Sequence, residues 1–96
     1  MEKVFVTTII WRSDSETDAT FYVFKDKKAA FEKMRALIDE EMDEETSWCA
    51  NAFDENGKPK DDGGRYDVYE AIDYWSVTDR WNDIFSTIFV REMEVL

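Results

Sequence analysis

The sequence contains no histidine, one cysteine, one proline and three glycines. Without histidine, the chain lacks the commonest general base and the residue on which most catalytic triads depend. Cys49 has no second cysteine for an internal disulfide and no histidine to activate it, so it is predicted to be a small buried hydrophobe rather than a nucleophile. The sequence therefore favours a non-enzymatic protein with no cofactor and no metal.

Basic residues are also scarce, and long apolar runs are missing. Twelve basic residues stand against 23 acidic ones, which gives a formal net charge of −11 at pH 7. This excess of negative charge argues against direct binding of nucleic acid or of an anionic membrane. No apolar run approaches the roughly 20 residues of a membrane-spanning helix, and no stretch resembles a signal peptide. We therefore expect a cytoplasmic location.

All three glycines and the proline lie in one stretch, 54–65, which reads DENGKPKDDGGR. Its pair Asn56-Gly57 favours a tight turn. The oxygen-bearing side chains superficially suggest a calcium loop, but glycine comes at the fourth position instead of the sixth and two lysines intrude. We predict an exposed, mobile acidic and glycine-containing loop that binds no metal.

Residues 1–96 are expected to form a single compact domain, because 44% of them are apolar and 16% are aromatic. The stretch 26–45 reads DKKAAFEKMRALIDEEMDEE and places apolar residues on one helical face. Asp26 is a suitable N-cap. Acidic residues at positions 41 and 45 interrupt the apolar face, so the helix is predicted to end near Met42. A longer helix that continues to position 52 is the alternative.

Four other stretches have the composition of strands: 3–11, 20–24, 66–77 and 84–95. The first and last are apolar on both faces, which is typical of strands inside a sheet. Stretch 66–77 alternates less regularly, because Glu70 interrupts it, and is predicted to be an edge strand. The expected fold is α+β in the order β-β-α-β-β, with a four-stranded sheet ordered 2-1-4-3 and one amphipathic helix on one face.

One helix cannot cover both faces of such a sheet. Either segment 46–60 folds over the second face, or that face forms a protein–protein interface, where aromatic residues concentrate. A two-fold homodimer buries such a patch with a single self-complementary contact. We expect a homodimer.

The acidic run Asp39–Glu45 is the most unusual feature, because six of its seven side chains are carboxylates. It lies where the helix macrodipole is already negative and holds three like-charge pairs at i, i+4, a cost of roughly 1 kcal/mol. The run is either a solvated face or a docking surface for a basic protein. Candidate partner-binding residues are the acids of the run and two tryptophans: Asp39, Glu40, Glu41, Asp43, Glu44, Trp11 and Trp81.

The leading functional hypothesis is a small acidic protein-interaction module, non-enzymatic, that binds a basic protein partner. The alternative is a nucleic-acid mimic that inhibits a DNA- or RNA-binding protein, since carboxylates on a helix can imitate a row of phosphates. In this acidic character the chain resembles short proteins carried by phages and mobile elements, some of which inhibit host defence enzymes. A third hypothesis is a small-molecule or catalytic site between the sheet and loop 54–65.

Overall fold

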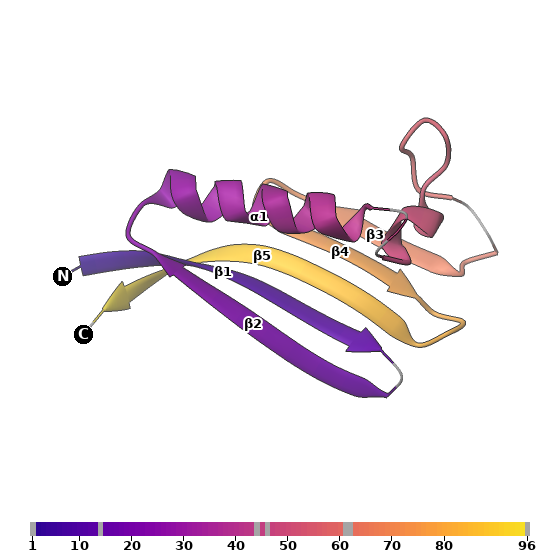
Figure 1. Cartoon of the computed structure of the whole chain (residues 1–96), viewed down its shortest axis with the longest axis horizontal. Helices are drawn as coiled ribbons and strands as arrows, with labels where there is room; N and C mark the ends of the chain where they lie inside the picture. The colour runs from indigo at the N-terminus through magenta and orange to yellow at the C-terminus, as the bar shows by residue number, and fades with distance from the viewer. Residues whose placement is uncertain (1, 14, 44, 46, 61–62, 96) are drawn as a thin grey trace.

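The computed structural model describes residues 2–13, 15–43, 45, 47–60 and 63–95. Its elements are, in order, β1 (Glu2–Ser13), β2 (Glu16–Phe24), α1 (Lys27–Glu41), the short 3₁₀ helix η1 (Cys49–Ala52), β3 (Tyr66–Glu70), β4 (Tyr74–Asp79) and β5 (Ile84–Val95). The strands form one antiparallel sheet in the order β2-β1-β5-β4-β3, and α1 lies across one of its faces (Figure 1). Among the described residues, no helix has the length and apolar character needed to cross a membrane.

Strand β1 is apolar on both faces and lies inside the sheet, between β2 and β5, as its composition predicts. Its odd-numbered residues face α1, because the buried hydroxyl of Thr7 donates a 2.7 Å hydrogen bond to the Ala30 carbonyl of the helix. Its even-numbered residues face the opposite way. Strand β2 begins at Glu16, earlier than the predicted stretch 20–24, because residues 16–19 continue the pairing with the end of β1.

Helix α1 follows its predicted bounds. The Asp26 side chain caps it by accepting a 3.1 Å hydrogen bond from the backbone N–H of Lys28, and Met42 is the C-cap. The alternative of a longer helix is wrong, because the chain turns after Met42 and η1 forms a separate helical turn. Alternating strand residues meet the apolar stripe of α1 in one core, whose buried members include Ile9, Ala30, Met34, Leu37, Trp75, Val77, Ile88 and Val90.

The prediction of a single edge strand at 66–77 is wrong. Two strands, β3 and β4, are joined by a tight turn in which the Ala71 N–H donates a 2.7 Å hydrogen bond to the Tyr74 carbonyl. The turn lets Val68 and Val77 pair with each other on the helix side, whereas one continuous strand would point them to opposite faces. The sheet therefore has five strands ordered 2-1-5-4-3 instead of four ordered 2-1-4-3, although the last strand does lie beside the first as predicted.

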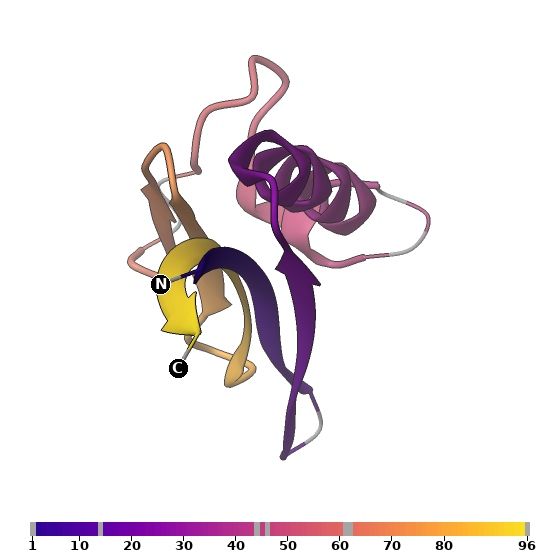
Figure 2. The same cartoon turned by 90° about the vertical axis from the view of Figure 1, so that its left-hand side faces the viewer.

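Segment 47–60 lies on the same side of the sheet as α1. Cys49, Ala52 and Phe53 are buried and join the core formed by α1 and the helix-facing strand residues. The ribbon shows η1 beyond the C-terminal end of α1, with the following loop rising away from the sheet (Figures 1 and 2). The described part of this segment therefore does not cover the second face of the sheet.

The predicted turn at Asn56-Gly57 is present within the exposed loop. The Asp54 side chain accepts hydrogen bonds of 2.9 and 3.0 Å from the backbone N–H groups of Asn56 and Lys58. Gly57 has a φ of 76°, a conformation that glycine adopts without strain. These bonds explain why an Asp, an Asn and a Gly occur together at this point of the chain.

Candidate interaction surfaces

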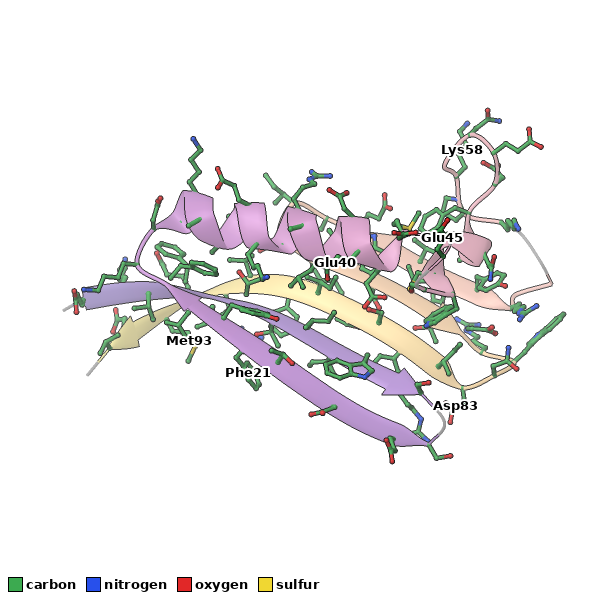
Figure 3. All side chains as sticks on the ribbon, in the orientation of Figure 1. Phe21, Glu40, Glu45, Lys58, Asp83 and Met93 are labelled. Atoms are coloured by element: carbon green, nitrogen blue, oxygen red, sulfur yellow. The ribbon has the colours of Figure 1, made fainter. Side chains whose placement is uncertain are left out.

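The acidic run lies on the helix side of the molecule, at the C-terminal end of α1 (Figure 3). Asp39, Glu40, Asp43 and Glu45 are exposed, and Glu44 lies outside the described residues. Glu41 differs, because it is half-buried and its Oε2 accepts a 2.8 Å hydrogen bond from the Ser47 hydroxyl. This bond ties the end of α1 to the segment leading into η1, so Glu41 has a structural role.

The two candidate tryptophans occupy different environments. Trp81 is 65% exposed in the turn between β4 and β5, at the same end of the molecule as the C-terminal end of α1 (Figure 1). Trp11 is half-buried and packs against the core on the helix face. The structure thus places Trp81 and the acidic run at one end of the molecule, while Trp11 contributes mainly to packing.

Beside Trp81 lies a charged cluster that was not predicted from the sequence. The Arg65 guanidinium donates hydrogen bonds of 3.1 and 3.0 Å to the two carboxylate oxygens of Asp79, which is only 2% exposed. The same carboxylate accepts bonds from the backbone N–H of Trp81 and from the Asn82 side chain, at 3.1 and 2.9 Å. Asp79 therefore holds the β4–β5 turn to the start of β3.

The Arg65 guanidinium beside Asp79 holds the pKa of that carboxyl below its usual value. Burial opposes this shift, while the bonds from Asn82 and from the Trp81 backbone add to it. Arg65 also lies 4.9 Å from the centre of the Tyr66 ring and 5.0 Å from that of Trp81. These contacts join the β4–β5 turn to the start of β3, which indicates a structural role.

Cys49 is buried, in agreement with the expectation from its isolation in the sequence. Its backbone N–H donates a 3.3 Å hydrogen bond to the Ser47 hydroxyl, and its sulfur lies 3.9 Å from Glu41 Oε2. Burial, assisted by the negative charge of Glu41, raises the pKa of the thiol to about 12. A thiol in this environment stays protonated near neutral pH and is a poor nucleophile.

A groove runs between α1 and the β3–β4 turn. Its larger part, of about 610 Å³, has an apolar floor of Phe31, Met34, Ile38 and Trp75. The rim of this part is formed by exposed residues, four of them charged and one apolar: Lys28, Glu32, Arg35, Glu70 and Ile72. A second part of about 420 Å³ continues past Phe31 and Ile72 toward Val90 and Glu92. Among the described residues of loop 54–65, where the third hypothesis expects a site, none lines this groove.

The side of the sheet opposite α1 is called here the open face. It consists of the even-numbered residues of β1 and β4 and the odd-numbered residues of β2, β3 and β5. Phe21, Val23 and Tyr69 are between 60% and 65% exposed on it. Phe21 and Met93 lie on the side of the sheet away from α1, whereas Glu45 and Lys58 lie on the helix side (Figure 3).

An aromatic band crosses the open face from edge to edge and is formed by Phe21, Phe89, Tyr74 and Tyr69. The Phe89 and Tyr74 rings are stacked with their centres 5.9 Å apart, and Tyr74 meets Tyr69 edge-on at 5.5 Å. Thr8 of β1 stands between Phe21 and Phe89 in the register. Thr8 is buried although it belongs to the open face.

Charge on the open face is sparse and balanced. Its only acidic strand residues are Glu2 and Asp67, which form ion pairs with Lys25 at 3.7 Å and with Arg80 at 3.1 Å. Its two basic strand residues are Arg12, paired with Asp83 at 3.0 Å, and Arg91, stacked 5.5 Å from the centre of Phe89. The other acidic strand residues face the helix side: Glu16, Asp18, Glu70, Asp79, Glu92 and Glu94.

Within the described ranges, no three acidic or cysteine side chains are grouped so that they could hold a metal ion. Comparison of the chain with protein families, with curated proteins and with solved structures finds no match. The arrangement of side chains on the two faces of the sheet therefore carries the functional inference.

The acidic run supplies a matched pair of stability predictions. Replacing Glu40, Glu41 and Glu44 by glutamine is the change that the sequence suggests, but the bond from Ser47 makes Glu41 unsuitable. We expect Asp39→Ala to raise the free energy of unfolding by about 0.5–1 kcal/mol at low salt, because it removes a charge that the helix dipole and Asp43 both disfavour. Glu41→Ala should lower it by about 1–2 kcal/mol through the lost hydrogen bond. Urea denaturation of both variants measures these changes, and equal effects would contradict the distinction.

Proposed function

We propose that this protein is a non-enzymatic interaction module that binds a basic protein partner through its helix side. The observation that carries the proposal is the separation of charge between the two sides of the sheet. Acidic strand residues on the open face are few and paired, whereas the exposed acids of the run lie with α1 on the other side. Such a one-sided field attracts a basic protein and orients it toward the helix side.

The groove beside α1 supplies the apolar contact that a charged surface alone lacks. Its floor of Phe31, Met34, Ile38 and Trp75 can receive an apolar side chain of the partner. Ile72, which is 88% exposed at the rim, is available for direct contact. In this proposal the acidic run increases the rate of encounter and the groove holds the partner in place.

A comparison of two charge variants tests the proposal. The helix-side variant carries Asp39→Asn and Glu45→Gln, and the control carries Asp67→Asn and Glu2→Gln on the open face. Both remove two negative charges, one aspartate and one glutamate, at exposed positions, so the two variants lose charge on opposite sides of the sheet. We expect a partner retained from a lysate of the source organism by wild type and control to bind the helix-side variant roughly three to ten times more weakly.

The affinity of the purified partner is then measured against salt concentration. Binding through the helix side should weaken as the salt concentration rises. At a fixed salt concentration, Ile72→Lys should bind the partner more weakly than wild type does, because it places a cation in the contact with a basic partner. A partner that binds both charge variants equally, or whose affinity is independent of salt, would contradict the proposed surface.

The nucleic-acid mimic is the second candidate, and the gathering of acids on the helix side supports it too. The two candidates differ in the identity of the partner. If the partner is a DNA- or RNA-binding protein, duplex DNA should displace it from the immobilised module, and the module should inhibit its binding to nucleic acid. A partner that duplex DNA leaves bound would support the general interaction module instead.

A further inference from the structure

We infer that the open face is a homodimer interface, on which a second copy of the chain packs against the aromatic band about a two-fold axis. This inference concerns the face opposite the proposed partner site and does not depend on the identity of the partner.

The first support is the amount of exposed apolar surface. Phe21, Val23 and Tyr69 are at least 60% exposed, and Met93 and Val95 are each more than 40% exposed on the same face. Monomeric proteins rarely expose contiguous apolar patches beyond a few hundred Å². Within the described ranges, α1, η1 and Phe53 all pack on the other side of the sheet. The open face is therefore suited to contact with an occupant from outside this part of the chain.

The second support is the area of the open face. Strands of the observed lengths, at about 3.3 Å per residue and 4.8 Å between neighbours, give the open face an area of roughly 700 Å². A stable, specific interface buries about 800 Å² on each partner. The whole open face, with the side chains at its margins, is thus of the size that a single protein–protein contact requires.

The third support is the distribution of charge, which allows a second copy to approach the open face. Two chains that each carry −11 repel each other. In a contact through the open face, however, the acidic runs point outward on both sides of the dimer. The face itself carries the paired acids Glu2 and Asp67 and the cations Arg12 and Arg91, so it presents no large charge of one sign to its copy.

Single-stranded nucleic acid is the other occupant to which an aromatic sheet surface is suited, because bases stack on exposed rings. Such surfaces combine stacking rings with a positively charged groove that follows the phosphates. Here Arg91 lies on Phe89, and Arg12 is already paired with Asp83. The open face lacks the row of cations needed to offset the net charge, so a second copy is the favoured occupant.

Sedimentation velocity from low to high micromolar concentration tests the inference. We expect wild type to form a dimer, and ~1 M salt to strengthen it by screening the repulsion between the two copies. Phe21→Lys should weaken the dimer about tenfold or more, because it places a buried cation in the contact. The matched control is Ile72→Lys, which makes the same change of charge at an exposed apolar residue in the helix-side groove and should leave the dimer unchanged.

Phe21 and Ile72 are both largely exposed, so both variants are expected to fold, and circular dichroism verifies this. A wild type that stays monomeric at low and high salt would overturn the inference. So would equal dimerisation of wild type and Phe21→Lys, or equal loss in both lysine variants. Binding of a fluorescent oligothymidine that Phe21→Lys abolishes would also overturn it, in favour of a nucleic-acid surface.

Discussion

Asp79→Ala is expected to lower the free energy of unfolding by about 3 kcal/mol at pH 7. The substitution leaves the guanidinium of Arg65, in a largely buried ion pair, without its carboxylate partner. The carboxylate is 2% exposed and takes two hydrogen bonds from Arg65 in addition to those from Trp81 and Asn82. Its loss frees the β4–β5 turn and the start of β3 together. Urea denaturation followed by tryptophan fluorescence measures the change.

Asp67→Ala is the matched control, because Asp67 forms an ion pair with Arg80 at 3.1 Å. Both partners of that pair are about 60% exposed, so the loss should stay below about 1 kcal/mol. Similar losses in the two variants would contradict the structural role of Asp79.

The stabilisation of the fold by the Asp79 carboxylate should decrease at acid pH. The folded protein holds the pKa of Asp79 below its ordinary value of 3.8, so the ionised carboxylate stabilises the fold above that pH. This contribution is lost as the pH falls through the folded-state pKa. The difference in stability between wild type and Asp79→Asn should therefore be full at neutral pH and shrink below pH 3.8. A difference that stays constant with pH would mean that the carboxylate acts through packing alone.

The thiol of Cys49 is expected to react about a thousandfold more slowly with a thiol reagent at pH 8 than the same thiol in the unfolded chain. Burial and the nearby Glu41 raise its pKa from 9.0 to about 12, and the thiolate is the reactive form. The measurement is labelling with a chromogenic disulfide reagent in buffer and in concentrated urea. Fast labelling of the native protein would mean that η1 opens readily.

A cysteine introduced at Lys58, in the exposed loop, is the positive control and should label rapidly without denaturant. The raised pKa also has a consequence for stability. Because the fold favours the protonated thiol, its contribution is complete below pH 9 and is lost as the pH rises above that value.

Hydrophobic patterning was sufficient to predict the part of the fold that surrounds α1. Val4, Phe5, Val6 and Ile9 made β1 apolar on both faces, which correctly indicated a strand between two neighbours. Asp26 ahead of an apolar helical stripe correctly located the start of α1. These features are local, since each depends on residues a few positions apart in the chain.

The turn between β3 and β4 was not predicted, because the sequence marks it only by a change in which alternate positions carry the core-facing residues. Val68 and Val77 both need the helix-side core, yet they are an odd number of residues apart, so one uninterrupted strand cannot place both there. The turn residues 71–73 read Ala-Ile-Asp, with neither glycine nor proline to mark them. The odd spacing of Val68 and Val77 would have identified the hairpin.

The pairing of Asp79 with Arg65 could not be predicted, because it joins positions 14 residues apart that meet only when β3 and β4 pair. The acidic run differs from this cluster, because part of its character can be predicted from the sequence. Its excess of charge is evident from sequence, but only the folded chain distinguishes Glu41, bonded to Ser47, from exposed Asp39. The sequence likewise left open whether segment 46–60 covers the second face of the sheet, and it did not predict the aromatic band that crosses this face.

We expect the open face to be bare in the single chain and to become covered when a second copy binds. Labelling of a freshly reduced Val23→Cys variant with a maleimide, after removal of the reductant, tests this most directly, because Val23 is 64% exposed and Cys49 does not compete for the reagent. We expect fast labelling at high dilution and slow labelling at concentrations where the dimer forms. Slow labelling at high dilution would show that the chain covers its own open face. A fast rate at all concentrations, in low and high salt, would show that no second copy binds there.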